Sequence, residues 1–592
     1  MILPRLEWLL PDPVAEPPTL AGFGRPVATL LARRGFRDDA QLDRFLHAGE
    51  SSLHDTSLMA DADVALDRIE RAIDAGERIA IWGDYDADGM TAVVVWVLAL
   101  RAPGVEPLRH VPSRLAEGYG LSLPGLERLR AGGATLVITC DCGVVNVAEV
   151  EEARGLGIEV IVTDHHLPSG PLPRAVAVVD PHRPECAYPD PDLTGAGIAF
   201  KLASALLVRR GRAAADLAGV AAIGTIGDMA PMTGESRAIV RLGLAELAVT
   251  SRPGLRALLA RSTETPTAPT ARDLAFGVAP RINSAGRIAD AELAMSLLLE
   301  EDAAAAKRIA DELERVHAER RAITLTTIEE ARRLAADSDG AGPLALVGEA
   351  WAPGVLGLVA TRLVESLGRP VAIAAPVDDE LRGSVRGPAD FHAALALEAC
   401  ADLLLKRGGH PAAGGFSLRR ADWAAFAAAF AALPRPFPAD PGRAALRATA
   451  LEIDLVLPAA HLGWPLAEEI ARLAPFGPGH VEPLLAVSGL LVAEARRVGS
   501  SGDHLALRMR RGTEIFDAIA FGMPADRPLP EPGAAIDLVG TLERDLFQGL
   551  PRLRLRVVDY ADATASPLLA RRVAVALPIV VGDAVAAGTP RR

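Results

Sequence analysis

Three aspartates at alternate positions, Asp84, Asp86 and Asp88, lie between two strongly apolar stretches of the chain. The stretch before them, 78–82, predicts a short buried strand, and the stretch after them, 91–100, is long enough for a buried helix. A strand, a loop and a helix in this order form the unit of an open α/β sheet, which binds ligands at the carboxyl ends of its strands. The aspartates therefore stand on a loop where such a sheet would hold a ligand.

Carboxylates crowded on one loop repel one another, so they cannot all stay ionised without a neutralising partner. A divalent cation such as Mg²⁺ or Mn²⁺ removes that repulsion, and both ions accept oxygen ligands. A solvated acidic turn is the simpler alternative, because Asp and Gly favour turns. A calcium loop fits less well, since the EF-hand loop with its closing Glu is absent.

Further candidate ligands follow other apolar segments. The predicted strand 134–140 ends at Asp141, and the predicted strand 159–163 is followed by Asp164, His165 and His166. Asp228 follows a Gly-rich apolar run. Each of these residues alone has a simpler explanation, because a lone Asp after a strand is usually a helix N-cap.

Together these segments predict one metal site on one rim of one sheet. Its expected ligands are Asp86, Asp88, Asp141, His165 and Asp228. Mixed carboxylate and imidazole ligation suits Mn²⁺, with Mg²⁺ as the alternative. The number of ligands suits two ions with one bridging carboxylate, an arrangement that serves phosphoryl displacement.

The pattern of elements predicts an α/β protein of several domains in its 592 residues. Strands alternate with helices from 78 to about 230, which predicts a parallel sheet, and short alternating strands after 445 predict a small β-barrel or a β-sandwich. The expected divisions are an N-terminal helical segment 1–75, a catalytic α/β domain 76–288, a long connecting helix 289–338, a smaller α/β domain 339–435, a barrel 445–562 and a tail 563–592.

Composition restricts the kind of partner. The formal net charge is -14, so a nucleic acid would need a local basic patch. The four cysteines include no CxxC pair, which fits a reducing compartment. We see neither a signal peptide nor an apolar run long enough for a membrane span, and we expect a cytoplasmic protein.

The predicted barrel carries arginines on one face of two strands. Arg508 and Arg510 alternate with apolar residues in one strand, and Arg552, Arg554 and Arg556 do so in another. Two such strands predict a positive stripe that tracks a phosphate backbone. An ordinary solvated barrel face is the alternative. Aromatic residues make up only 4% of the chain, so base stacking cannot be extensive.

The motif Asp164-His165-His166, with the loop 84–89 upstream, resembles the DHH phosphoesterase superfamily. Within it the chain resembles the RecJ family, whose members are single-strand-specific 5′→3′ DNA exonucleases of bacteria. The resemblance runs from about residue 25 to about residue 560, and it implies a DHH domain, a DHHA1 domain and an OB-fold. Further segments that carry it are 112–120, 280–287, 351–357, 383–386, 408–414 and 476–479.

This resemblance implies a role for individual residues. Asp86 and Asp141 would hold one metal ion, while Asp88, Asp141, His165 and Asp228 would hold the other. His166 would face the scissile phosphate, and Asp84 and Asp164 would orient the ligands. The remaining implied substrate contacts are Arg114, Arg281, Asn283, Arg287, Ser384, Arg386 and His410. Ala352 stands where the family often has His, so any substrate contact of that His would be absent here.

The implied activity is metal-dependent degradation of single-stranded DNA from the 5′ end to 5′-mononucleotides, in DNA repair and recombination. Single-stranded-DNA-binding protein and a repair helicase are the implied partners. A phosphodiesterase acting on short oligoribonucleotides or cyclic dinucleotides is one alternative, although a small substrate needs no extended barrel surface. A catalytically inactive DNA-binding subunit is another, although the complete ligand set argues against it.

Overall fold

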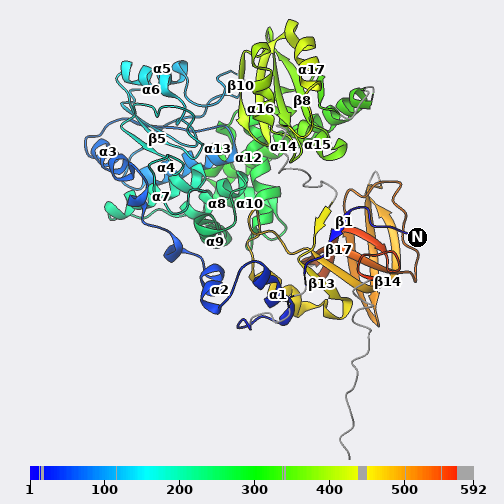
Figure 1. Cartoon of the computed structure of the whole chain (residues 1–592). Coiled ribbons are helices and arrows are strands. Elements are labelled where there is room, and N and C mark those ends of the chain that lie inside the picture. The colour runs from blue at the N-terminus through cyan, green and yellow to red at the C-terminus, as the bar shows by residue number, and fades with distance from the viewer. Residues whose placement is uncertain are drawn as a thin grey trace, which may run out of the picture. The chain divides into compact units, whose positions relative to one another are not determined.

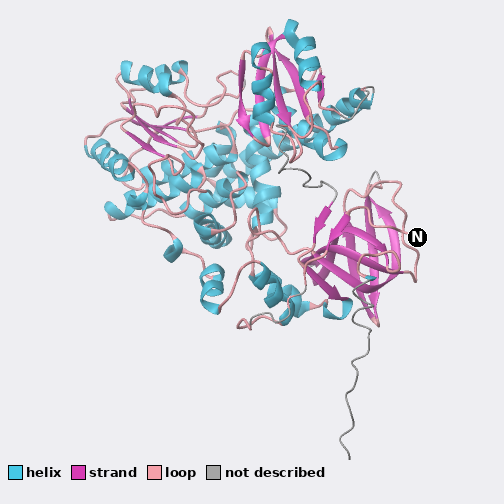
Figure 2. Cartoon of the chain, viewed as in Figure 1, coloured by secondary structure: helices cyan, strands magenta, loops and turns pink. Residues whose placement is uncertain are grey.

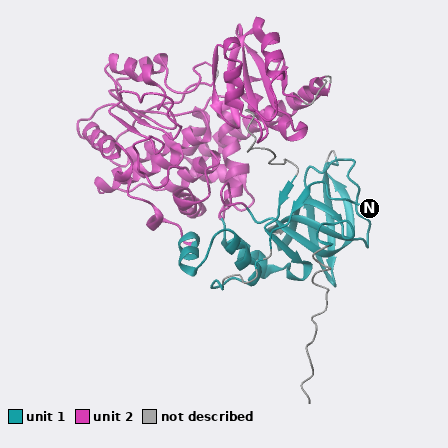
Figure 3. Cartoon of the chain, viewed as in Figure 1, with its two compact units in different colours: residues 1–46, 449–474, 482–592 teal, residues 47–448, 475–481 magenta. Residues whose placement is uncertain are grey.

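The structure, a computed structural model, describes residues 1–12, 14, 19–114, 116–336, 338, 342–437, 450–499, 502–547 and 550–569. The chain forms two compact units, which Figure 3 distinguishes by colour. The α/β unit consists of residues 47–448 and 475–481, and the barrel unit consists of residues 1–46, 449–474 and 482–592. Figures 1 and 2 show the elements of both units.

A five-stranded parallel sheet organises the first half of the α/β unit, in the order β3-β2-β4-β5-β6. The bounds are Ile79–Trp82 for β2, Leu108–His110 for β3, Leu136–Thr139 for β4, Glu159–Thr163 for β5 and Ala177–Val179 for β6. The predicted parallel sheet is confirmed, with β3 as an addition. The sequence does not predict β3, because Leu-Arg-His contains no apolar run.

Helices cover both faces of this sheet, and the strand residues alternate between two cores. Ile79 and Ile81 pack with α4, α7 and α8, while Ala80 and Trp82 pack on the opposite face with α5 and α6. Helix α4 is apolar on all sides and buried along almost its whole length. The helices of this half are α3 Ala62–Asp74, α4 Ala87–Arg101, α5 Leu123–Ala131, α6 Val147–Gly155, α7 Gly195–Arg209, α8 Leu217–Gly227, α9 Gly234–Val249, α10 Pro253–Ser262, α11 Ala271–Asp273, the π-helix η3 Leu274–Val278 and α12 Ala279–Ile288.

The predicted single helix over 289–338 is two helices. Helix α13 covers Glu292–Leu299, and the 34-residue helix α14 covers Ala303–Ala336. Between them Glu300 accepts hydrogen bonds from the backbone N–H groups of Glu301 and Asp302, at 2.9 and 2.8 Å. Asp302 in turn accepts one from Ala305 N at 2.7 Å. Carboxylates that capture backbone donors in this way end one helix and start the next.

The second half of the α/β unit contains a mixed sheet in the order β10-β11-β9-β8-β7, in which only β7 and β8 are parallel. Its elements are β7 Leu344–Val347, η4 Pro353–Val355, α15 Leu356–Leu367, β8 Val371–Val377, β9 Glu380–Arg386, α16 Ala393–Ala399, β10 Lys406–His410, β11 Ala413–Arg419 and α17 Trp423–Ala431. Gly409 lies within β10 with φ 145°, and a Cβ there would lie 2.3 Å from Ala413 O. Glycine is needed for this close strand pairing.

The barrel unit contains a closed barrel, because β14 pairs with both β15 and β17 in the order β13-β14-β15-β16-β18-β17. The predicted barrel is therefore confirmed. Its strands are β13 Leu455–Pro458, β14 Leu485–Val498, β15 His504–Arg511, β16 Glu514–Ala520, β17 Ala535–Phe547 and β18 Leu550–Asp562. Helix α18, Trp464–Arg472, lies between β13 and β14 in the sequence.

The N-terminal residues do not form one helical segment over 1–75. Helices α1 Arg25–Arg33 and α2 Asp39–Leu46 belong to the barrel unit, whereas α3 packs beside β6 and α7 in the α/β unit. The chain also begins with a strand, β1 Glu7–Leu9, which pairs in parallel with β12 Ala450–Glu452. Asp559 of β18 secures this segment by accepting hydrogen bonds from Arg5 N, Leu6 N and Trp8 Nε1, at 2.9–3.0 Å.

Two segments of the predicted domain divisions lie outside the described residues. They are 438–449, around the predicted start of the barrel, and 570–592, which is most of the predicted tail. Over the part of the chain that is described, no helix is both long and apolar enough to cross a membrane.

A buried ion pair joins α7 to α9 and provides a test of the fold. Lys201 Nζ lies 2.7 Å from Glu235 Oε1, and neither side chain is more than 3% exposed. We expect Lys201→Met to lower the free energy of unfolding by about 3–5 kcal/mol, because it leaves the Glu235 carboxylate buried without its cation. Urea denaturation followed by circular dichroism measures this. Arg315→Met, which breaks an exposed pair with Glu312, should change stability by less than about 0.5 kcal/mol; equal effects of the two variants would contradict the prediction.

Candidate metal centre

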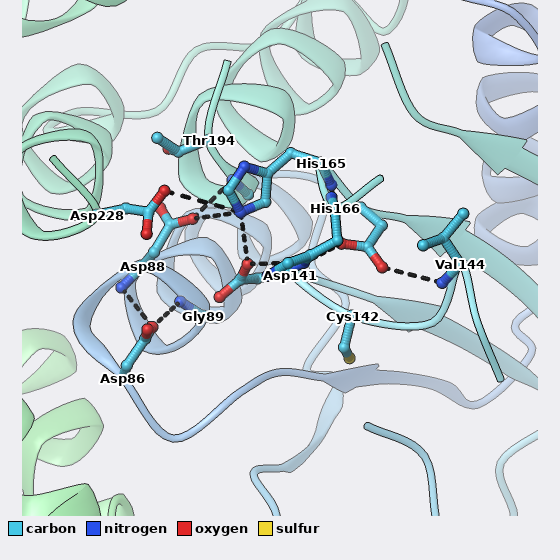
Figure 4. A network of polar contacts seen from close by, with 12 residues as sticks. Asp86, Asp88, Gly89, Asp141, Cys142, Val144, His165, His166, Thr194 and Asp228 are labelled. Carbon is cyan, nitrogen blue, oxygen red and sulfur yellow. Dashed lines mark hydrogen bonds and ion pairs between the residues drawn. The ribbon is translucent and has the colours of Figure 1, made fainter. Parts of the chain in front are cut away.

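His165 stands at the centre of a cluster of carboxylates, as Figure 4 shows. Its Nε2 lies 3.0 Å from Asp141 Oδ1, 3.9 Å from Asp88 Oδ2 and 3.8 Å from Asp228 Oδ2. The three carboxylates come from the start of α4, the end of β4 and the end of α8. Residues far apart in the sequence thus present ligand atoms to one point.

The structure brings together all five predicted ligands. One group with ligand atoms within 4.8 Å of one another contains Asp88, His165 and Asp228, and a second contains Asp84, Asp86 and Asp141. A third contains Asp141 with His165 and His166. Asp141 and His165 each belong to two of these groups, so the groups adjoin one another.

Local geometry holds these carboxylates in place. Asp86 is the N-cap of α4, where it accepts hydrogen bonds from the N–H groups of Asp88 and Gly89 at 2.9 and 3.0 Å. Asp88 accepts hydrogen bonds from Gly195 N and Ala196 N at the start of α7, at 2.7 and 3.0 Å. A Cβ on Gly195 would lie 2.5 Å from the Cβ of Asp141, so only glycine lets α7 approach the site. Asp141 itself has a left-handed φ of 62°.

Asp228, which follows a Gly-rich apolar run in the sequence, is the C-cap of helix α8. The Gly-rich apolar run before it is buried on all sides and forms a helix, because it packs against α4, α7 and α9. The carboxyl end of a helix carries partial negative charge and disfavours a carboxylate. A cation beside Asp228 removes this conflict.

Burial and mutual repulsion raise the carboxylate pKa values across the cluster. Burial, followed by the charge of neighbouring aspartates, raises the pKa of Asp84, Asp88 and Asp141, and it raises the pKa of Asp228 to about 7. Burial opposes the charging of His165, but the carboxylates around it raise its pKa nonetheless. Asp84 Oδ1 is buried without a hydrogen-bond partner. This set of oxygen and imidazole donors fits Mn²⁺ or Mg²⁺.

Asp164 orients the two histidines that follow it. It is fully buried, and its Oδ1 accepts hydrogen bonds from His165 N at 2.8 Å and His166 N at 3.2 Å. The same oxygen lies 2.8 Å from His166 Nδ1, while Oδ2 accepts a hydrogen bond from Val144 N at 2.9 Å. Burial opposes ionisation, yet these hydrogen bonds and His166 keep the pKa of Asp164 below its usual value. His166 therefore carries its Nδ1 proton toward Asp164 and has Nε2 free for another partner.

Tyr119 is a site residue that the sequence analysis missed. Its hydroxyl donates to Asp141 O at 3.0 Å and lies 3.0 Å from His166 Nδ1. Its ring contacts the His166 ring edge-to-face, with centroids 5.5 Å apart. Tyr119 lies in the segment 112–120 that carries the family resemblance, but nothing in its local pattern reveals a contact with the distant histidine.

A cavity of about 630 Å³ lies in the α/β unit and is rich in arginine. The lining residues that the sequence analysis had singled out are Arg114, Arg287, Ser384 and Arg386. Arg386 Nη1 donates to Ser384 Oγ at 2.7 Å, and Arg287 Nη1 donates to Gly354 O at 3.0 Å. The guanidinium of Arg114 lies 3.9 Å from the ring centroid of Tyr85.

Arginines outnumber carboxylates in the lining of this cavity, which also contains Glu117 and Glu380. Among the described residues, no carboxylate forms an ion pair with Arg114, Arg287 or Arg386. Burial, and then the charges of Arg114 and Arg320, lower the pKa of Arg287 to about 9. Uncompensated arginines around a cavity make an anion site, since guanidinium groups match phosphate geometry.

Three other predicted substrate residues have different surroundings. Arg281 forms an ion pair with Glu314 of α14 at 2.6 Å and donates to Gly277 O at 2.8 Å, and it does not line the cavity. Its charge is thus engaged within the protein.

Asn283 accepts a hydrogen bond from Ala87 N at 2.7 Å and so fixes the start of α4. The His410 ring lies nearly parallel to the His166 ring, at 6.1 Å between centroids. Ala352 packs as a half-buried apolar side chain against the core of the second sheet.

Most arginines of the predicted positive stripe on the barrel have carboxylates beside them. Across five neighbouring strands the register aligns Glu494, Arg508, Asp517, Arg554 and Glu543, so the signs alternate. Arg554 lies 3.1 Å from Glu543, and Arg552 lies 3.2 Å from Asp517. A two-residue period identifies the outward face of a strand but not the residues beside it on the next strands. Outside this row, Arg510 is exposed, whereas Arg556 lies 3.8 Å from Glu543 and 5.9 Å from the ring centroid of Phe521.

Family sequence models match three parts of the chain. The DHH family, N-terminal domain, matches residues 78–225, the DHHA1 domain matches residues 341–433, and the RecJ OB domain matches residues 453–559. Fold and site together therefore define a DHH-class protein with a DHHA1 domain and an OB-fold barrel.

Whole-chain comparisons narrow this class. The single-stranded-DNA-specific exonuclease RecJ of Bacillus subtilis is 33% identical over 540 residues, 90% of this chain and 68% of the relative. The exonuclease of the same name from Thermus thermophilus is 41% identical over 506 residues, 84% of this chain and 70% of the relative. The crystal structure of Thermus thermophilus RecJ in complex with Mn²⁺ superposes with a TM-score of 0.78 at 32% identity, over 94% of this chain and 80% of that one. Its Mg²⁺ complex superposes with a TM-score of 0.72. The chain belongs to the RecJ family.

The raised carboxylate pKa values predict how pH and metal act on stability. The folded pKa of Asp228 is about 7 against an ordinary value of 3.8, so between these values the metal-free folded state holds more protons than the unfolded chain. Its stability should therefore fall as pH rises through this window. Metal binding needs ionised carboxylates, so we expect Mn²⁺ to raise Tm more at about pH 8 than at about pH 5.

Differential scanning calorimetry of the whole chain measures both effects. Asp228→Asn removes one titrating ligand and should reduce both the pH dependence and the gain from Mn²⁺. A gain in Tm from Mn²⁺ that is the same at both pH values would contradict the assignment.

Proposed function

We propose that this chain is a metal-dependent exonuclease that degrades single-stranded DNA from the 5′ end to 5′-mononucleotides, acting in DNA repair and recombination. The observation that carries the proposal is the convergence of Asp88, Asp141, His165 and Asp228 in the same unit as a cavity lined by three arginines, Arg114, Arg287 and Arg386, that have no ion-pair partner among the described residues. Two curated relatives that the chain resembles along most of its length are named single-stranded-DNA-specific exonucleases.

The ligands divide into two ion sites. Asp86 and Asp141 would hold one Mn²⁺, and Asp88, Asp141, His165 and Asp228 would hold the other, with Mg²⁺ as the alternative. When bound, such ions neutralise a phosphodiester and lower the pKa of a water molecule. The solved structures of Thermus thermophilus RecJ with Mn²⁺ and with Mg²⁺ support this choice of metal.

His166 would contact the scissile phosphate through Nε2. Burial opposes its protonation, but Asp164 raises its pKa, and a protonated Nε2 would donate a hydrogen bond to a phosphate oxygen. Asp164 and Tyr119 hold the ring from the Nδ1 side. The nearby His410 ring would close the other side of the substrate.

The arginine cavity would receive the 5′-terminal phosphate. Arg114 and Arg386 would provide paired N–H donors and Ser384 a hydroxyl, with Arg287 behind them. A terminal phosphate held there would place the next phosphodiester toward Asp141 and His166. This arrangement accounts for 5′→3′ polarity and for release of single nucleotides.

The length of the substrate distinguishes the proposed exonuclease from a phosphodiesterase that acts on small molecules. A short oligoribonucleotide or a cyclic dinucleotide would have no use for the barrel domain, whereas a long strand can follow it. On the barrel, Arg510 is a better candidate for phosphate contact than Arg508, Arg552, Arg554 and Arg556, which have carboxylates beside them.

A cytoplasmic setting fits the four cysteines, which are all free thiols. Family resemblance makes single-stranded-DNA-binding protein and a repair helicase the expected partners.

Removal of the shared ligand tests the metal centre. We expect Asp141→Ala to abolish cleavage while DNA affinity stays near wild type, because the binding charges lie on arginines elsewhere. Nucleotide release from labelled single strands measures the first effect, and fluorescence anisotropy measures the second. Glu127→Ala, which removes an exposed carboxylate from α5 of the same domain, should leave both unchanged. Wild-type turnover by Asp141→Ala would refute the ligand assignment.

Removal of one cavity arginine tests the end pocket. We expect Arg386→Ala to weaken the transition-state interaction with 5′-phosphorylated strands by about 1.5–3 kcal/mol and to affect 5′-hydroxyl strands much less. The ratio of kcat/KM for the two substrates reports the change. Arg362→Ala removes an exposed arginine of α15 and should preserve the ratio. An Arg386→Ala enzyme with the full preference for a 5′ phosphate would exclude Arg386 from the pocket.

A further inference from the structure

Residues 475–481 belong to the α/β unit, although the residues on both sides of them belong to the barrel unit. We call this segment, Pro-Phe-Gly-Pro-Gly-His-Val, the inserted turn. It is closed by two backbone hydrogen bonds, Gly477 N to His480 O at 3.0 Å and His480 N to Gly477 O at 3.1 Å. His480 is buried, and its ring stacks on Phe476 at 5.2 Å. The inserted turn is therefore a compact, packed element.

The inserted turn contacts the loop 229–233, which directly follows Asp228. Met232 N donates a hydrogen bond to Pro478 O at 2.6 Å. A Cβ on Gly477 would lie 3.3 Å from the Cβ of Met232, and a Cβ on Gly479 would lie 3.4 Å from the Cβ of Pro231. These glycines allow the two backbones to approach closely.

A buried arginine secures the same contact from α9. Arg237 is 1% exposed, and its Nη1 donates to Pro475 O at 2.7 Å. The first turn of α9 thus holds the start of the inserted turn, as loop 229–233 holds its middle.

The loop also fixes the end of helix α8 and hence the position of Asp228. Met229 N bonds to Ile226 O at 3.1 Å and Ala230 N bonds to Thr225 O at 3.2 Å, which is the Schellman arrangement. Met229 has φ 61°, a conformation that is unfavourable for a residue with a Cβ and persists only where its surroundings impose it. The inserted turn is part of those surroundings, because it binds the loop three residues further on.

We propose that the inserted turn is a positioning element of the metal centre. It holds loop 229–233 so that the Asp228 carboxylate stays beside His165 Nε2, at 3.8 Å. The inference rests on the proposed function in one respect, the assignment of Asp228 as a metal ligand. It gives a role to the segment 476–479, which the family resemblance includes and the proposed chemistry does not use.

Gly479→Val tests the proposal in the full-length chain. Gly479 has φ 71°, which a β-branched residue resists, and the added methyl groups would press on Pro231 and Thr233. We expect about tenfold weaker Mn²⁺ binding in a calorimetric titration, as for other residues that orient metal ligands. Gly479→Asn should stay near wild type, because Asn accepts a left-handed backbone.

Gly211→Val is the matched control. Gly211 follows α7 with φ 60° and has no atom within 4 Å of its would-be Cβ, so its substitution adds similar backbone strain away from the loop. Mn²⁺ affinity should not change. If Gly479→Val does not fold, Gly477→Ala serves instead, since its Cβ would press on Met232 without a left-handed backbone.

A double-mutant cycle with Asp228→Asn separates positioning from general loss of stability. If the inserted turn acts through Asp228, Gly479→Val should weaken Mn²⁺ binding in the wild-type background but not in the Asp228→Asn background. Equal effects in both backgrounds, or wild-type affinity in folded Gly479→Val, would overturn the inference alone. Unchanged Mn²⁺ binding in Asp228→Asn by itself would overturn the ligand assignment and the inference with it.

Discussion

Repulsion among buried carboxylates is the constraint on which the rest of this structure depends. Asp84, Asp88 and Asp141 are nearly inaccessible to solvent, and burial together with neighbouring negative charge raises the pKa of each. The surrounding helices reduce the conflict only in part: the start of α7 donates two N–H groups to Asp88, whereas the end of α8 places its negative pole at Asp228. A bound cation completes the neutralisation of these carboxylates, so metal binding relieves the repulsion that the folded chain leaves uncompensated.

A second unbalanced group, of opposite sign, lies in the same α/β unit. Arg114, Arg287 and Arg386 line one cavity without carboxylate partners among the described residues, and their mutual repulsion contributes to the low pKa of Arg287. In the proposed function, a phosphodiester with bound metal ions and a terminal phosphate would neutralise both groups, since it would bring cations to the aspartates and anions to the arginines. This complementarity explains how a chain with a formal net charge of -14 can take a polyanion as its substrate.

The barrel shows the opposite arrangement. Its row of Glu494, Arg508, Asp517, Arg554 and Glu543 balances charge internally, strand by strand. Such cross-strand pairs stabilise the sheet and leave little net charge for a ligand. The inserted turn, whose flanking residues belong to the barrel unit, packs beside the loop 229–233 that follows Asp228. Metal centre and barrel connection therefore share contacts within the α/β unit.

Local patterns in the sequence determined the strands β2, β4 and β5, the carboxylates and histidines at their ends, and the run of short strands that forms the barrel. These are encoded within short windows, because a strand end and the residues after it occupy one rim of a parallel sheet wherever the sheet forms. Only the tertiary structure decided that Asp228 caps a helix, that Tyr119 contacts His166, that Glu314 engages Arg281 and that carboxylates flank the barrel arginines. Each of these contacts depends on which side chain from a distant part of the sequence lies beside the residue in the folded protein. Packing of whole elements sets that pairing, and no periodicity along the chain records it.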